Sequence, residues 1–170
     1  VASIAPGKRQ LIRLIKQSAP AAGQERAYRI LVDEVPVKEQ AQDAAPGGAE
    51  MGLKFQMRYS VPLFVSGKGI WTKQDSEKPR DYATASQPQL SYRLQQQSSE
   101  RWLEVRNQGA VHARISKVTL QGRSLNPGLM GYVLPGSQMR FALPPAGGFS
   151  SGKLMATVND NKQPVAIPSY

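Results

Sequence analysis

Cysteine is absent from the 170 residues, and histidine occurs once, at position 112. The first absence excludes thiol catalysis, disulfide bonds and zinc sites built on cysteine. The second means that a catalytic triad or a multi-histidine metal site would need residues from another chain. No nucleophile–base pair or metal constellation can be assembled from the residues present. We therefore expect a protein that is not an enzyme and that holds no metal or cofactor.

Long apolar runs are also missing, since none approaches the roughly 18 residues that a membrane-spanning helix needs. We expect no membrane insertion. The chain begins at Val1, without an initiator Met or a basic and then apolar leader. This start predicts that the sequence is the inside of a longer protein or a trimmed form of it.

Acidic residues are few: 12 Asp and Glu stand against 22 Lys and Arg, for a net charge of +10. Such an excess is typical of proteins that bind nucleic acid or anionic surfaces, and it also suits a protein that clamps carboxylates. The basic residues are scattered, and no dense Lys/Arg arm is present. Nucleic acid is therefore not the favoured partner.

Helical periodicity is weak, and 13 prolines and 15 glycines interrupt the chain at short intervals. This pattern predicts short strands and turns, as in a sandwich or barrel. The segments that we expect to form strands are 9–16, 26–35, 53–63, 90–94, 101–107, 113–120, 139–142 and 154–159.

The pattern divides the chain into two domains. Residues 73–87 are polar, contain proline and lack periodicity, which is typical of a linker. Residues 88–170 contain enough strands for a small β-sandwich, whereas residues 1–72 offer three and an immunoglobulin-like sandwich needs about seven. Either the first domain lacks its first strands in this chain, or something else closes its core. The predicted fold class is all-β, with two immunoglobulin-like β-sandwich domains of which the first is incomplete.

The clearest strand pattern lies in residues 53–63. Leu53, Phe55, Met57, Tyr59 and Val61 alternate with Lys54, Gln56, Arg58, Ser60 and Pro62. Such alternation usually marks an ordinary core strand. The proline indicates that at least one side of the strand is an edge, because proline has no N–H for a ladder.

Five motifs, taken in order, resemble the periplasmic chaperones of the chaperone–usher pilus pathway, and among them the archaic branch. No single motif is highly specific, but the order and spacing of all five are. They are Pro6–Leu14 (PGKRQLIRL), Tyr28–Pro36 (YRILVDEVP), Leu53–Phe64 with its RYSVPLF ending, Leu103–Asn107 (LEVRN) and Val158–Asp160 (VND).

The resemblance implies that the protein lends a strand to a fimbrial subunit. A pilus subunit is a sandwich that lacks its last strand, and the long chaperone strand fills the resulting groove. We expect Leu53, Phe55 and Met57 to fill the groove, and Tyr59 and Val61 to stay in the chaperone's own domain. The resemblance further implies a periplasmic location, delivery of subunits to an outer-membrane usher, and no catalysis.

In the family, two basic residues hold the subunit's C-terminal carboxylate and so fix the register of the added strand. One of them lies in a part of the family's sequence that this chain does not include, and Pro62 occupies the position of the other. We expect Arg58 and Arg29 to replace them, since a guanidinium grips a carboxylate with two hydrogen bonds. The alternative is that Arg58 is a solvated strand residue and Arg29 a structural ion-pair partner.

The resemblance also implies an ion pair between the two domains. Glu34 and Asp160 match the family's acidic positions, but Ser66 replaces the arginine, and Lys68 is the expected substitute. Asp33 and Glu34 are adjacent on a predicted strand and face opposite sides, so they do not form a catalytic pair. We interpret His112 as an incidental polar residue.

Two other functions compete with a chaperone. An immunoglobulin-like adhesion or structural module predicts that strand 53–63 is paired within the chain, whereas a chaperone predicts an edge that is open or covered by a partner. A nucleic-acid binder predicts Lys and Arg gathered on one face with aromatic residues.

Overall fold

The computed structural model describes residues 2–35, 56–70, 85–144 and 152–170, and every helix or strand among them is a β-strand. In this part of the chain, nothing forms a helix with the length and apolar character that a membrane crossing requires. The predicted all-β fold class is confirmed. In chain order the strands are β1 (Glu25–Asp33), β2 (Arg58–Ser66), β3 (Leu90–Gln97), β4 (Glu100–Asn107), β5 (Ala113–Leu120), β6 (Arg123–Val133), β7 (Gln138–Ala142), β8 (Leu154–Val158) and β9 (Val165–Ile167).

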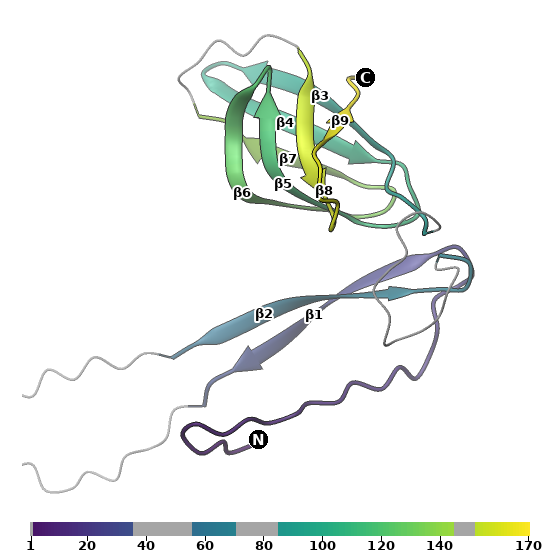
Figure 1. Cartoon of the computed structure of the whole chain (residues 1–170), viewed down its shortest axis with the longest axis vertical. Coiled ribbons are helices and arrows are strands. Elements are labelled where there is room, and N and C mark those ends of the chain that lie inside the picture. Colours follow the sequence, from purple (N-terminus) through teal and green to yellow (C-terminus); the bar gives the residue numbers. More distant parts are fainter. Residues whose placement is uncertain (1, 36–55, 71–84, 145–151) are drawn as a thin grey trace, which may run out of the picture.

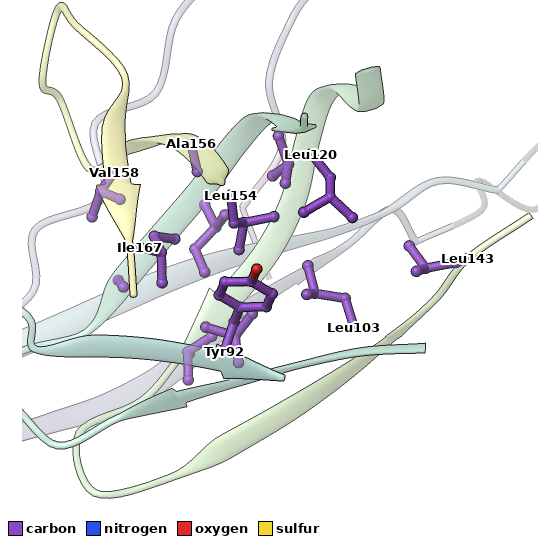
Figure 2. Packing of buried hydrophobic residues seen from close by; sticks show 13 residues of the cluster. Tyr92, Leu103, Leu120, Leu143, Leu154, Ala156, Val158 and Ile167 are labelled. Atoms are coloured by element: carbon purple, nitrogen blue, oxygen red, sulfur yellow. The ribbon is translucent and has the colours of Figure 1, made fainter. Parts of the chain in front are cut away.

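Strands β3 to β9 form a two-layer sandwich (Figure 1). One sheet has the order β3-β4-β7 and the other has the order β6-β5-β8-β9. Alternate residues of both sheets point into the space between the layers, where side chains such as Tyr92, Leu103 and Leu154 pack together (Figure 2). These three side chains have at most 2% of their surface exposed. Burial of apolar surface between the layers therefore stabilises this half of the molecule.

The hairpin of β5 and β6 shows how local sequence sets the shape of the second sheet. Gln121 and Gly122 form its turn with φ angles of 51° and 77°. Two consecutive positive φ angles match the twist of a two-residue hairpin, and the glycine adopts one of them without steric cost. Lys117, with φ 49°, lies where the pairing register with β6 shifts, so β5 contains a bulge.

Most of the predicted strands are confirmed, and β5 has the predicted bounds. Strand β6 was missed because Asn126-Pro127-Gly128 resembles a turn. The structure places this tripeptide inside β6, where the Asn126 side chain accepts a hydrogen bond of 2.8 Å from the Gly128 N–H. β6 is the outermost strand of its sheet, a position in which a proline is tolerated. The three-residue strand β9 was also missed.

The expected strand at 9–16 is wrong, because this segment has no strand assignment. Its apolar side chains are largely exposed, and Leu11 and Ile15 have about four fifths of their surface accessible (79% and 80%). A strand needs a hydrogen-bonded neighbour, and the sheets of the described residues include none for this segment.

Some predictions fall on residues that the structure does not describe. The expected polar loop at 38–50 lies outside the described residues, as do residues 73–84 of the expected linker. The division of the chain into domains 1–72 and 88–170 therefore stays a prediction.

Candidate functional site

Strands β1 and β2 pair antiparallel as an isolated two-stranded hairpin at one end of the sandwich (Figure 1). The register places Tyr28 opposite Leu63, Ile30 opposite Val61 and Val32 opposite Tyr59. Directly paired residues share a face, so these six apolar side chains form one side of the hairpin. We call them the apolar face. Arg29, Asp33, Arg58 and Ser60 share the opposite side, the polar face, with Phe64 and Glu25.

The apolar face is open to solvent. Tyr28, Tyr59 and Val61 each have about half of their surface exposed, at 49%, 51% and 48%. Several large apolar side chains lying side by side are normally covered, either by a partner or by further strands of the same domain. The alternation predicted for residues 58–62 is confirmed, with Tyr59 and Val61 on one face and Arg58, Ser60 and Pro62 on the other.

Among the described residues, β2 pairs with β1 alone, so its outer edge has no neighbouring strand. Pairing with β1 continues just beyond the strand, because the Glu34 N–H donates to the Met57 carbonyl (2.9 Å) and the Met57 N–H donates to the Glu34 carboxylate (3.2 Å). Met57 is half exposed, at 49%. Leu53 and Phe55, the other expected groove-filling residues, lie outside the described residues.

Arg58 is held by Asp33, the residue opposite it on β1. Its Nε and Nη2 atoms donate to the two carboxylate oxygens at 2.5 and 3.1 Å. The hydrogen bond from Arg58 lowers the pKa of Asp33, and Asp33 in turn raises the pKa of Arg58. A carboxylate that approached Arg58 would thus have to compete with an existing two-pronged ion pair.

Arg29 has a different environment. Its Nη1 atom donates to the Ser60 hydroxyl at 3.1 Å, and it has no acidic partner among the described residues. The rest of its guanidinium can bind a carboxylate, and the Ser60 hydroxyl keeps its own proton to donate. Of the alternative that Arg58 is solvated and Arg29 is ion-paired, the first half agrees with the 69% exposure of the Arg58 side chain. The ion pair, however, is made by Arg58 and not by Arg29. The carboxylate-binding role of both residues stays a prediction.

The three residues expected between the domains have these neighbours. The Glu34 carboxylate accepts from the Met57 N–H, and Asp160 accepts from Arg114 at 3.0 Å. The Lys68 carbonyl accepts from the Gly23 N–H at 2.8 Å. The predicted interdomain role of Glu34, Asp160 and Lys68 is not established by these contacts and stays a prediction.

A contact between hairpin and sandwich does exist, and it centres on His112. One carboxylate oxygen of Glu25, Oε1, lies 2.8 Å from both the backbone nitrogen and Nδ1 of His112. The rings of Phe64 and His112 are stacked, with centroids 3.4 Å apart and planes at 7°. Tyr132 lies beside both rings, with its centroid 5.7 Å from that of Phe64. Because Glu25 and Phe64 share the polar face, that face is the one turned toward the sandwich.

Interpreting His112 as an incidental polar residue was therefore wrong. Its side chain is 7% exposed and that of Glu25 is 1% exposed, so the pair is buried at the contact. The other oxygen of Glu25, Oε2, is also buried and finds no hydrogen-bond partner among the described residues. Nothing in the sequence signals this contact, because the two partners are 87 positions apart and neither belongs to a recognisable motif.

The described residues contain no group of His, Asp and Glu side chains that would hold a metal ion. Asp33 and Glu34, the adjacent carboxylates, are engaged by Arg58 and by the Met57 N–H respectively. The described part of the hairpin thus has the features of a protein-binding surface: an open strand edge, an exposed apolar face and an arginine with donors to spare.

Comparison with known proteins agrees with this description. Residues 1–70 match the family model of the pili and flagellar-assembly chaperones, PapD N-terminal domain. The structure resembles the CsuC chaperone in the crystal structure of the CsuC-CsuE chaperone–tip adhesion subunit pre-assembly complex, from the archaic chaperone-usher Csu pili of Acinetobacter baumannii. The TM-score is 0.63 at 29% sequence identity, over 91% of this chain and 65% of that one. The search of curated proteins found no match.

These matches confirm the resemblance to pilus-assembly chaperones that the five motifs predicted, and they support a chaperone role. The all-β fold, which matches that of a chaperone with two immunoglobulin-like sandwiches, is likewise supported. The chain spans less than two thirds of the structure it matches.

Proposed function

We propose that this chain is part of a periplasmic chaperone that caps pilus subunits by donor-strand complementation and delivers them to an outer-membrane usher. The observation that carries the proposal is the outer edge of β2, which has no neighbouring strand among the described residues. An adhesion module would pair that edge internally. The periplasmic location and the usher rest on the resemblance to the family alone.

Strand addition explains why such an edge is present. The unpaired N–H and C=O groups of β2 offer a ladder to an incoming strand, and alternate side chains fill pockets in the partner. In the sequence, Leu53, Phe55 and Met57 continue the alternation of Tyr59 and Val61, and we expect them to face the subunit. Burying each of them contributes about 1.5–3 kcal/mol before the cost of ordering the chains. An open apolar edge left uncovered would instead promote aggregation.

The register between the donor strand and the subunit must be fixed by at least one specific contact, because a slip of one residue would turn every apolar side chain to the wrong face. Arg29 is the stronger candidate for that point. It lies on the polar face that turns toward the sandwich, it has donors to spare, and the Ser60 hydroxyl beside it adds another. Arg58 is the second candidate, provided that the subunit carboxylate displaces Asp33.

The direct test is capture of a subunit. The full-length chaperone is produced in a bacterial periplasm together with the pilus subunit encoded beside it, and complexes are isolated through a tag on the subunit. We expect an equimolar complex that is lost when Phe55→Asp places a charge in the subunit groove. Lys54→Asp, a charge change at the neighbouring position on the other face, is the matched control and should preserve the complex.

Two results would overturn the proposal. Normal capture by Phe55→Asp would contradict the assignment of residues 53–57 as the donor strand. Equal loss of the complex in Phe55→Asp and Lys54→Asp would indicate a general effect of charge. A folded wild-type protein that captures no subunit offered to it would favour the adhesion module.

A further inference from the structure

The outer face of the β3-β4-β7 sheet carries a cluster of arginines and aromatic rings that strand donation does not use. Register places Arg93 opposite Glu104 on β4, and Glu104 opposite Arg140 on β7. Arg106 and Trp102 lie two positions to either side of Glu104, so they share this face. Tyr170 lies on the same side of the sheet, where it contacts Glu104 and Arg106. We call these residues the arginine face; its members are Arg93, Trp102, Glu104, Arg106, Arg140 and Tyr170.

Glu104 organises the arginine face. Its carboxylate accepts from Arg93 and Arg140 and from the Tyr170 hydroxyl, each at 2.8 Å. Although it points away from the core, Glu104 is fully covered by these three side chains (0% exposed). The side chains of Arg93 and Arg140 nevertheless remain 42% and 58% exposed. The carboxylate therefore holds two solvent-facing arginines in fixed positions.

Positive charge remains after this pairing. Three arginines stand against one carboxylate, so two positive charges are left at the centre of the face. Arg106 has no acidic partner among the described residues and lies over the Tyr170 ring, 4.6 Å from its centroid. Glu100 lies on the same side of β4 and lines the depression beside Trp102, so it offsets one of these charges. An excess of one positive charge thus remains on the arginine face.

The composition and shape of the face are those of a protein interface. Trp, Tyr and Arg are the residues most enriched among interface hot spots. Arg140 lies 5.5 Å from the Trp102 ring centroid, and both residues line an open depression of about 570 Å³. Arg106 lines a second depression of about 450 Å³ at the other end. Side chains held in place before binding lose little entropy when a partner arrives.

We propose that the arginine face docks an acidic segment of a partner protein, with carboxylates bound by Arg106, Arg93 and Arg140 and an apolar side chain against Trp102. The planar guanidinium fork matches a carboxylate. The face lies on the sandwich and not on the hairpin. It thus goes beyond the proposed capture of subunits and provides a second contact on another part of the molecule.

The test is an NMR titration of the protein with a short peptide of Glu and Tyr residues, with the same peptide carrying Gln for Glu as the control ligand. We expect the acidic peptide to shift the Trp102 indole N–H and the Nε–H signals of Arg93 and Arg140. Arg106→Glu should weaken binding by about tenfold, or about 1.4 kcal/mol. Arg123→Glu makes the same charge change on β6 of the other sheet and should weaken it by about twofold or less.

Equal weakening by the two variants, or shifts confined to other residues, would overturn the proposal, because binding would then follow net charge alone. If phosphatidylglycerol vesicles shift these NMR signals and the peptide does not, the proposal is overturned, and the face binds a membrane surface instead. Arg106→Glu should still capture the pilus subunit. That readout separates failure of the arginine face from failure of the chaperone function.

Discussion

Phe64 and His112 are stacked face to face across the contact between the hairpin and the sandwich, with ring centroids 3.4 Å apart. Phe64 is near the end of the expected donor strand, and His112 immediately precedes β5. Among the described residues, the strand and the sandwich are thus joined by the Phe64–His112 pair, with Tyr132 beside both rings, and by the buried Glu25–His112 contact. Small changes at these residues should alter the position of the hairpin before they unfold either part.

The first prediction concerns this pair. Phe64→Ala should loosen the hairpin, because a stacked aromatic pair contributes about 0.5–1.5 kcal/mol beyond its buried area. Small-angle scattering should show an increased radius of gyration, and limited proteolysis should cut the protein faster near the hairpin. The unfolding temperature of the sandwich should change little. Tyr28→Ala, on the opposite face of the hairpin, is the control, and equal effects of both variants would contradict the prediction.

The second prediction separates the two candidate carboxylate anchors. Arg29→Ala should weaken subunit capture more than Arg58→Ala does, since Arg58 is already engaged by Asp33. Lys54→Ala, which removes a positive charge from the same segment, should have the smallest effect. Dissociation rates of the purified complexes provide the measurement. Equal rates for all three variants would exclude a specific anchor among them.

The third prediction is a pH dependence of the sandwich. Hydrogen bonds from Arg140 and Tyr170 lower the pKa of Glu104, against the opposing effect of burial. Glu104 therefore contributes stability that is present above its unfolded pKa of about 4.3 and is lost as the pH falls through the lower folded value. Glu104→Gln should flatten the acid limb of a denaturation-midpoint profile. An unchanged acid limb would show that Glu104 is not responsible.

The fourth prediction concerns the alkaline side of the same cluster. Burial and the hydrogen bond to Glu104 raise the pKa of Tyr170. Its contribution is complete below the unfolded pKa of about 10 and is lost as the pH rises through the higher folded value. Tyr170→Phe should remove this alkaline loss in the same profile. Tyr59→Phe, on the hairpin, should leave it in place.

The fifth prediction tests the core. Leu103 is fully buried between the sheets, and Leu103→Ala should lower the free energy of unfolding by about 2–5 kcal/mol. Leu129→Ala, at a position 54% exposed on β6, should change it by about 0.5 kcal/mol or less. Urea denaturation provides the measurement. Similar losses in both variants would mean that Leu103 does not contribute more to the core than Leu129.

Local pattern was enough to predict most of the sandwich, because its strands alternate apolar and polar residues and end at turn residues. Gln121-Gly122 is such a turn. The same logic failed at Pro127, since whether a proline ends a strand or lies within it depends on its place in the sheet. It failed at 9–16 too, where apolar residues lack a neighbouring strand. Sequence predicts which residues suit a strand but not which strands are available to pair.

The candidate site was predictable to a smaller extent. Alternation around Tyr59 and Val61 identified the two faces of the hairpin, and the register confirms them. The engagement of Arg58 by Asp33 depends on which residues lie opposite each other, and a single strand does not contain that information. The Glu25–His112 contact and the Glu104 cluster join segments far apart in the chain. Pairings of this kind follow from the folded geometry and leave no local pattern.

The edges of the sandwich have a consequence for stoichiometry. The edge strand β6 contains Pro127 and pairs with β5, which has a bulge. The other edge strand of this sheet, β9, is three residues long and is followed by Pro168. The edge of β3 is partly occupied, because Tyr92 exchanges backbone hydrogen bonds with Pro168 and Tyr170. Blunted edges of this kind resist the addition of further strands. Strand addition at β3, β6 or β9 is thus disfavoured, and these edges would not add a second subunit to one that the hairpin had taken up.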